Sequence, residues 1–161
     1  MTSRDDFKRP AVVLLAEDNP ADQEITRRVL GSGVFRCELH MVNDGVEALE
    51  YLSRTFEHPD THPRPDLLLL DINMPRRSGI EVLKQVKEDD DLRSIPALML
   101  TTSVADADIV SAYDLGCNSY ISKPVDVPQF VEALRKLGQY WLDLVALPGE
   151  AGNFERTEEA C

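Results

Sequence analysis

Five stretches of the chain carry hydrophobic patterns typical of β-strands. Residues 11–16, 67–70 and 96–100 are runs of mostly apolar side chains, which predicts strands buried on both faces of a sheet. Residues 38–42 alternate between polar and apolar side chains, which predicts a strand nearer a sheet edge. A short fifth strand is expected at residues 119–122.

Segments with apolar residues at helical spacing separate these strands. Asn19 and Pro20 favour the start of a helix that ends before Gly31. The same kind of pattern predicts helices around residues 46–52, 79–86, 106–115 and 128–145. The strand–helix unit is thus repeated five times. This order predicts a doubly wound α/β fold of the flavodoxin-like type, with a five-stranded parallel sheet, helices on both faces and an extended C-terminal helix.

The folded domain is expected to cover residues 10–147. Residues 1–9 are polar and predict a flexible leader, and residues 148–161 are polar with two glycines and predict a flexible tail. Residues 54–64 contain two prolines and two histidines and predict an exposed loop.

The predicted strands end in residues that can carry chemistry. Glu17 and Asp18 follow the first strand, Asp71 the third, Thr101 the fourth and Lys123 the fifth. In a parallel sheet these strand ends face the same edge, where doubly wound folds bind their ligands. Each residue alone has an ordinary structural explanation, such as a helix cap, a turn aspartate or a surface lysine. Their joint placement favours a functional site.

Electrostatics restricts what such a site can do. Two carboxylates about 4 Å apart repel by roughly 4 kcal/mol at an effective dielectric constant of about 20. One lysine cannot balance three acids, and an all-oxygen ligand set suits Mg²⁺, or the similar Mn²⁺. With the metal present, one carboxylate can act as the nucleophile of a phosphoryl transfer. Lys123 would then offset charge on the phosphoryl oxygens, and Thr101 would donate a hydrogen bond to one of them.

Composition narrows the possible partners. The 161 residues carry a formal net charge of −12, which disfavours direct binding to nucleic acid. No apolar run approaches the roughly 20 residues of a membrane span. The N-terminus lacks the apolar core of a signal peptide, and the three cysteines have neither paired nor metal-ligand spacing. These features predict a cytoplasmic protein with reduced thiols.

At this point the chain resembles the CheY-like receiver domains of two-component response regulators. The resemblance covers about residues 10–145. The motifs that carry it are Glu17-Asp18-Asn19, Asp71-Ile72-Asn73-Met74-Pro75, Thr101, Tyr120 and Lys123-Pro124.

The resemblance implies a role for each of these residues. Asp71 would accept a phosphoryl group from a sensor histidine kinase, and the protein would be no enzyme beyond slow self-dephosphorylation. The metal would be held by Glu17, Asp18, Asp71 and the backbone carbonyl of Asn73. Lys123 would contact the phosphoryl group beside a cis peptide bond to Pro124. Thr101 and Tyr120 would form a switch pair that changes the surface of the fourth helix, fifth strand and fifth helix.

Other features are similar to a subgroup of single-domain regulators paired with bacterial phytochromes. They are the run Thr101-Thr102-Ser103, the long loop before the leucine strand, and the extended last helix with Trp141. Regulators of this subgroup are often homodimers, and Tyr140, Trp141 and Leu144 are candidates for the dimer surface. The alternative is a longer helix that packs on its own sheet. No DNA-binding output domain is expected.

Thr102 departs from the pattern, because many receivers have alanine or glycine there; we expect it to narrow access to Asp71. Three other functions stay open at this point. A phosphohydrolase of the haloacid dehalogenase type would use the same nucleophile, but would need a second acid where Asn73 stands. A flavodoxin-like protein that binds FMN would need a different loop after the first strand. A receiver that serves only as a scaffold would not need the intact set of site residues.

Overall fold

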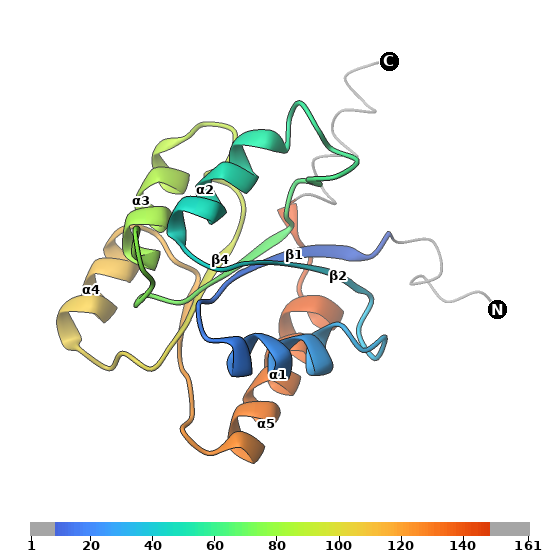
Figure 1. Cartoon of the computed structure of the whole chain (residues 1–161), viewed down its shortest axis with the longest axis vertical. Helices are drawn as coiled ribbons and strands as arrows, with labels where there is room; N and C mark the ends of the chain where they lie inside the picture. The colour runs from blue at the N-terminus through green and yellow to red at the C-terminus, as the bar shows by residue number, and fades with distance from the viewer. Residues whose placement is uncertain (1–8, 149–161) are drawn as a thin grey trace.

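The computed structural model describes residues 9–148, which fold as alternating strands and helices (Figure 1). The strands are β1 (Ala11–Ala16), β2 (Cys37–Val42), β3 (Leu67–Leu70), β4 (Ala97–Thr101) and β5 (Ser119–Ser122). The helices are α1 (Pro20–Leu30), α2 (Gly45–Arg54), α3 (Gly79–Glu88), α4 (Asp106–Asp114), α5 (Val127–Gly138) and a π-helical segment, η2 (Gln139–Leu144).

The five strands form one parallel sheet in the order β2-β1-β3-β4-β5. This confirms the predicted doubly wound fold. The alternating segment, now β2, lies at one edge of the sheet as predicted, and β5 lies at the other. The chain reverses its direction of travel across the sheet between β1 and β3, and doubly wound folds place their ligand crevice at such a point.

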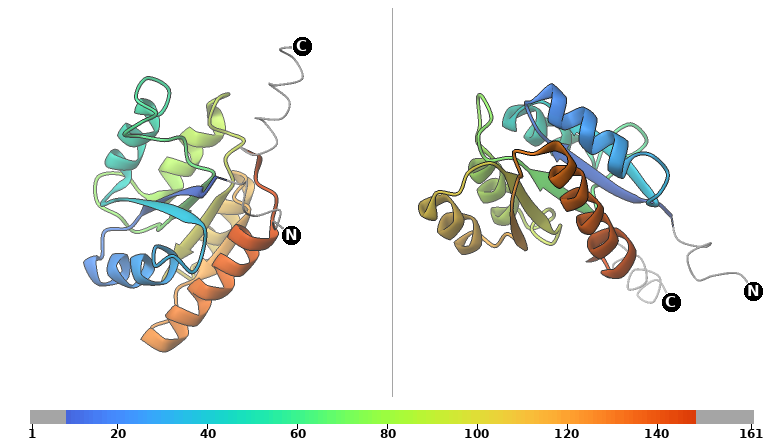
Figure 2. Two further views of the ribbon diagram at one scale, coloured as in Figure 1. Left: turned by 90° about the vertical axis from the view of Figure 1, so that its right-hand side faces the viewer. Right: turned by 90° about the horizontal axis from the view of Figure 1, so that it is seen from below.

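Helices cover both faces of the sheet (Figures 1 and 2). α1 and α5 lie side by side on one face, while α2, α3 and α4 cover the other. The leucines of β3 serve both layers, since successive side chains of a strand point to opposite faces. Leu68 and Leu70 pack toward α2 and α3, whereas Leu67 and Leu69 pack toward α1 and α5. This explains why the strand has four leucines and no alternation.

The helices begin where the sequence predicts. The side chain of Asn19 accepts hydrogen bonds from the backbone N–H groups of Ala21 and Asp22, and Ser78 caps α3 in the same way. Gly116, predicted to end the fourth helix, has a φ of 99°, a left-handed conformation that glycine adopts without strain. The predicted long last helix changes at Gly138 from α-helical to π-helical geometry.

The first described residue, Arg9, contacts the folded domain. Arg9, which was assigned to the leader, forms a two-point ion pair with the buried carboxylate of Asp66, at 2.6 and 2.7 Å. Asp66 also accepts a hydrogen bond from the backbone N–H of Val12. The rest of the predicted leader, and the predicted tail after Pro148, lie outside the described residues. Within residues 9–148, no helix has the length and apolar character needed to cross a membrane.

Candidate functional site

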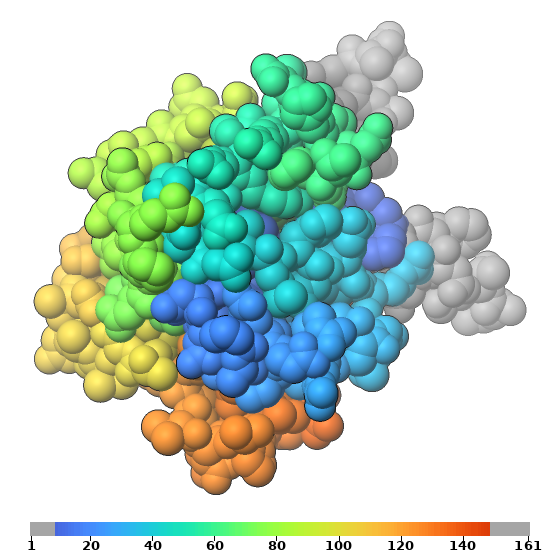
Figure 3. Space-filling view, in the orientation of Figure 1, coloured from blue at the N-terminus to red at the C-terminus, as the bar shows by residue number. Residues whose placement is uncertain are grey.

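The carboxyl edge of the sheet brings together all five residues that the strand ends predicted. Glu17 and Asp18 leave β1, Asp71 leaves β3, Thr101 ends β4 and Lys123 leaves β5. Backbone hydrogen bonds fix these exits, from the Asp71 N–H to the Ala16 carbonyl at 3.0 Å and from the Lys123 N–H to the Thr101 carbonyl at 2.7 Å. In the space-filling view, the start of α1 (blue), the loop after β3 (lime) and the segment before α4 (yellow) adjoin on the surface (Figure 3).

The ammonium of Lys123 is buried among carboxylates. Its Nζ donates to Glu17 Oε2 at 2.6 Å, to Asp22 Oδ2 at 2.9 Å and to Asp71 Oδ2 at 3.3 Å. Glu17 and Asp71 are also buried, whereas Asp22 is partly exposed. One positive charge thus faces three negative charges in a region from which water is largely excluded.

The pKa values of Glu17 and Lys123 are both raised, the first by burial and the second by hydrogen bonds. Burial raises the pKa of Glu17 to about 7, although hydrogen bonds from Lys123 and from the backbone of Asn19 act in the opposite sense. For Lys123, burial disfavours the charged form, but the hydrogen bonds to Glu17 and Asp22 outweigh it and raise the pKa above its usual value. Lys123 therefore stays charged at neutral pH, while Glu17 is near its midpoint.

One carboxylate oxygen of the site is buried and lacks a hydrogen-bond partner among the described residues. Asp71 Oδ1 accepts no hydrogen bond within residues 9–148, which is costly for a carboxylate oxygen shielded from water. Glu17, Asp18 and Asp71 each offer an oxygen atom, and these atoms lie within 4.8 Å of one another. The unpartnered oxygen, the exposed Asp18 beside it and the all-oxygen donor set fit a hard divalent cation.

Local sequence explains why Asp71 can be placed so deep in the edge. A Cβ atom on Gly79 would lie 2.0 Å from the backbone oxygen of Asp71, so only glycine allows the start of α3 to pack there. The N–H of Gly79 donates to the carbonyl of Ile72 at 2.9 Å, which fixes the turn after the acceptor residue. Asn73, whose carbonyl was predicted as a metal ligand, is exposed in this turn.

Sequence reasoning missed Asp22 as part of the site. It was interpreted only as an acid that suits the first turn of a helix, where it also lies. Its contact with Lys123 joins two residues that are 101 positions apart in the sequence. The available signal was its place in the first turn of α1, which begins at the same edge of the sheet directly after Glu17 and Asp18.

Ser103 connects the two predicted switch residues and was also missed as a site residue. Its N–H donates to the Thr101 hydroxyl at 3.2 Å, and its carbonyl accepts from the Tyr120 hydroxyl at 2.8 Å. Its own hydroxyl donates to Asp108 of α4 at 2.6 Å. Thr101 is fully buried, and Tyr120 is partly buried against the core below α2, α3 and α4. Tyr113 of α4 accepts a hydrogen bond from the backbone of Tyr120.

Two other predictions are modified by the structure. The predicted cis bond between Lys123 and Pro124 is wrong, because the described residues contain only trans peptide bonds. The trans form is the favoured one even before proline, by about 0.5–1 kcal/mol. Of the predicted dimer surface, Tyr140 is 53% and Leu144 is 74% exposed. Trp141, in contrast, packs partly against the core between the sheet and α1.

Comparison with known proteins adds independent information. The model of the response regulator receiver domain family matches residues 13–135, a span from β1 into α5. Response regulator Rcp1 of Synechocystis sp. is 35% identical over 144 residues, which cover 89% of this chain and 97% of that protein.

Solved structures of response regulators are also similar to this chain. The Mn²⁺-bound form of Rcp1 has a TM-score of 0.80 at 36% identity, covering 86% of this chain and 99% of the other. The phosphorylated cyanobacterial phytochrome response regulator RcpA has a TM-score of 0.80 at 37% identity, covering 86% and 98%. The bacteriophytochrome response regulator RtBRR has a TM-score of 0.64 at 40% identity, covering 93% and 91%.

Proposed function

The chain belongs to the response regulator receiver family, a phosphoacceptor component of two-component systems, and on that premise we propose that Asp71 is its phosphorylation site. The observation that carries this proposal is the environment of the Asp71 carboxylate. One of its oxygens is held by Lys123, and the other is buried and has no hydrogen-bond partner among the residues that the structure describes. An acceptor in this state can meet a cation or an incoming phosphoryl group without first breaking a strong contact.

The proposed reaction is phosphoryl transfer from a phosphohistidine of a sensor kinase. A carboxylate oxygen of Asp71 forms the new P–O bond as the P–N bond breaks, and the departing imidazole nitrogen takes up a proton. Lys123 offsets the added negative charge, and the Thr101 hydroxyl donates to a phosphoryl oxygen. Attack by water then slowly returns inorganic phosphate and the free carboxylate, so we infer a signalling domain whose turnover is limited to self-dephosphorylation.

The residues fit a Mg²⁺ or Mn²⁺ ion. Glu17, Asp18, Asp71 and the backbone carbonyl of Asn73 would hold it, and when bound it would neutralise charge on the phosphoryl oxygens. Lys123 would then have fewer carboxylates to balance, and its Nζ would be available to the phosphoryl group.

The response to phosphorylation would pass through Ser103. If the Thr101 hydroxyl turns toward the phosphoryl group, its hydrogen bond with the Ser103 N–H is lost, and Ser103 also bonds Tyr120 and Asp108. A change at Thr101 therefore alters the packing of Tyr120 and the position of α4. The surface formed by α4, β5 and α5 would be the part that a partner senses.

The partners follow from the same premise. We infer a sensor histidine kinase as the phosphoryl donor, and the likeness to RcpA and RtBRR favours a kinase of the phytochrome type. Tyr140 and Leu144 would contribute to a homodimer surface, with Trp141 supporting them from behind. The net charge of −12 argues against direct binding to nucleic acid, and we place the protein in the cytoplasm.

The decisive experiment is labelling with phosphoramidate or acetyl phosphate, with and without Mg²⁺. The wild type should gain a label that is stable in acid, labile in alkali and dependent on Mg²⁺. Asp71→Asn should remain unlabelled, whereas Asp60→Asn, which removes an exposed acid outside the site, should behave as the wild type. Absence of a Mg²⁺-dependent label on folded wild-type protein would disprove the proposed function.

A further inference from the structure

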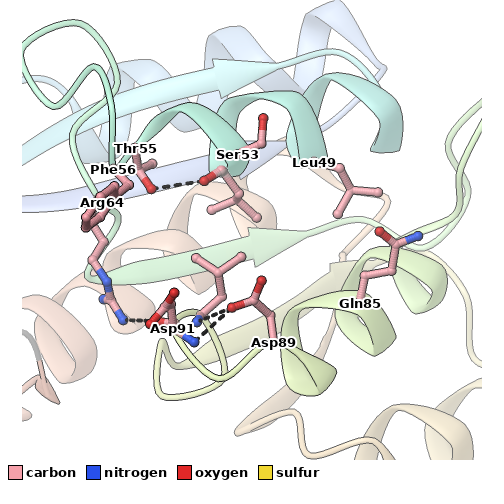
Figure 4. A pocket seen from close by; sticks show the side chains of 10 residues that line it. Leu49, Ser53, Thr55, Phe56, Arg64, Gln85, Asp89 and Asp91 are labelled. Carbon is pink, nitrogen blue, oxygen red and sulfur yellow. Dashed lines mark hydrogen bonds between the residues drawn. The ribbon is translucent and has the colours of Figure 1, made fainter.

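A cavity lies near the amino ends of β3 and β4, whereas Asp71 follows the carboxyl end of β3. It has a volume of about 570 Å³ and is formed by the end of α2, the loop that follows it and the end of α3 (Figure 4). Its walls contain Leu49, Leu52, Ser53, Thr55, Phe56, Arg64, Gln85, Asp89, Asp91 and Leu92. None of these residues belongs to the site described above.

One part of the cavity is apolar. Leu52 is buried, while Leu49 and Leu92 are partly buried and turn their remaining surface toward the opening. Phe56 is 93% exposed, so its ring contributes a large apolar surface that nothing within residues 9–148 covers. An aromatic ring held almost wholly in water next to an apolar cavity is unfavourable in the free protein, and it marks a place where a partner can bury it.

The other part of the cavity is acidic, and hydrogen bonds fix its conformation. Arg64 donates to the Asp91 carbonyl at 2.7 Å and to the Ser94 hydroxyl at 3.3 Å, which ties the loop after α2 to the loop after α3. Asp89 Oδ1 accepts the N–H groups of Asp91 and Leu92, so this turn is formed before any ligand arrives. Asp91 is exposed, and its carboxylate makes no hydrogen bond or ion pair with any described residue.

We propose that this cavity docks a protein segment that carries an aliphatic or aromatic side chain and, about one helical turn away, a lysine or arginine. The apolar side chain would enter between Leu49, Leu92 and Phe56. The cation would lie at Asp89 and Asp91, within a run of four acids, residues 88–91. Asp90 of this run forms an ion pair with Arg93 at 3.4 Å. A cation near the Phe56 ring would gain further from its π-face.

The negative charge of the cavity favours a basic occupant. The walls contain two carboxylates and one arginine whose guanidinium is already engaged, and the whole chain carries a net charge of −12. The acids of this cavity attract a basic segment and repel an anionic ligand or an acidic segment. The occupant is therefore a basic, amphipathic segment of a different protein.

The position of the cavity gives the docking a separate role. Arg64 precedes β3 and Leu92 precedes β4, whereas the proposed phosphorylation site lies where these strands end. A partner bound here leaves the carboxyl edge open to a kinase. Docking at this surface can thus hold a partner before, during and after phosphorylation, independently of the α4–β5–α5 surface.

The test uses the full chain and a fluorescein-labelled 14-residue helical peptide of leucine and lysine, with its leucine–glutamate counterpart as the control probe. Fluorescence anisotropy at physiological ionic strength should show binding of the leucine–lysine peptide only. The double variant Phe56→Ala/Asp91→Asn should bind about tenfold more weakly, since it removes an anchor and a charge of the proposed pocket. Both positions are exposed, and unchanged thermal unfolding would verify the fold.

A matched variant separates a specific pocket from general attraction to an acidic protein. Val125→Ala/Asp114→Asn also removes one exposed apolar side chain and one exposed carboxylate, neither of which lines the cavity. It should bind as the wild type does. Backbone amide shifts in NMR should change at residues 49–56 and 85–92. No binding by the wild type, equal losses in both double variants, or shifts centred on another surface would each overturn the proposal.

Discussion

Lys123 is shared among Glu17, Asp22 and Asp71, and this sharing decides how the site responds to pH. Without a cation, the three acids compete for one ammonium in a buried place. The carboxylate that has the least contact with solvent therefore takes up a proton most readily. Glu17 is that group, because burial raises its pKa to about 7, compared with an ordinary value of 4.5.

The raised pKa of Glu17 predicts a stability loss at neutral pH in the metal-free protein. The folded state binds this proton more tightly than the unfolded state, so the contribution is present below pH 4.5 and is lost as the pH rises to about 7. The loss is at most about 3 kcal/mol. Urea unfolding in EDTA between pH 5 and 8 should show a steeper decline for the wild type than for Glu17→Gln. Parallel pH profiles for the two proteins would contradict this.

We expect Thr102 to narrow access to the acceptor carboxylate from the solvent side. It is exposed and directly follows the buried Thr101. Thr102→Ala should therefore speed the loss of the phosphoryl group, by about threefold, or roughly 0.7 kcal/mol of activation free energy. Release of phosphate from the labelled protein in Mg²⁺ measures this rate, and Ser94→Ala, far from the site, is the control. Equal rates for Thr102→Ala and wild type would reject the effect.

Most of the site could be predicted from single residues because the fold collects strand ends at one edge. Glu17, Asp71, Thr101 and Lys123 needed only their positions after apolar runs. Asp22 and Ser103 could not be found in this way, since their roles depend on side-chain directions within a helix turn and a loop. A polar residue beside a site motif has many possible partners, and only the packed structure selects one.

Among the elements, α3 begins at a position that has no room for a side chain. Its first residue, Gly79, touches the backbone of Asp71 so closely that any side chain forces the helix away from the strand exit. Helix propensity and packing therefore make opposite demands at this position. Alanine is the better helix former by about 1 kcal/mol, but it has a Cβ atom that has no space here.

Gly79→Ala should destabilise the protein and impair phosphorylation together. Overpacking of this kind costs about 1–3 kcal/mol, more than the propensity gain. Urea unfolding gives the stability, and the phosphoramidate assay gives the rate of labelling. Lys84→Ala, an exposed position in the same helix, should leave both unchanged. If Gly79→Ala is as stable as Lys84→Ala and labels normally, the close approach has no importance for the site.

The last helix has a feature that its hydrophobic pattern did not predict. The apolar spacing predicted one long helix over residues 128–145, and helical backbone does cover nearly all of this range. The change to π-helical geometry after Gly138 has no hydrophobic signature, because it depends on which backbone carbonyl each N–H meets. The wider turn accompanies a split in which Trp141 packs toward the sheet and Tyr140 and Leu144 face outward.

For the whole molecule, this outward pair predicts a concentration-dependent dimer. Tyr140 and Leu144 expose apolar surface on an otherwise strongly charged protein, and burying both against a second copy would be favourable. Tyr140→Ser/Leu144→Ser should shift sedimentation velocity toward the monomer. The effect should be at least tenfold in the dissociation constant, since two interface anchors are lost.

Val125→Ser is the matched control for the dimer, because Val125 is 98% exposed and lies between β5 and α5, outside the π-helical segment that contains Tyr140 and Leu144. It should sediment as the wild type. A wild type that stays monomeric at high concentration would reject the dimer, and a dimer that survives the double change would reject this surface.

The hydrogen bonds around Ser103 have a thermodynamic consequence that extends beyond the domain. If phosphorylation at Asp71 and partner binding at α4 both depend on this residue, each changes the free energy of the other by the same amount. A partner that prefers the rearranged Tyr120 would then favour the acyl phosphate to the same degree that the acyl phosphate favours the partner. The lifetime of the signal would in that case be a property of the complex, and the abundance of the target would help to set how long each signal lasts.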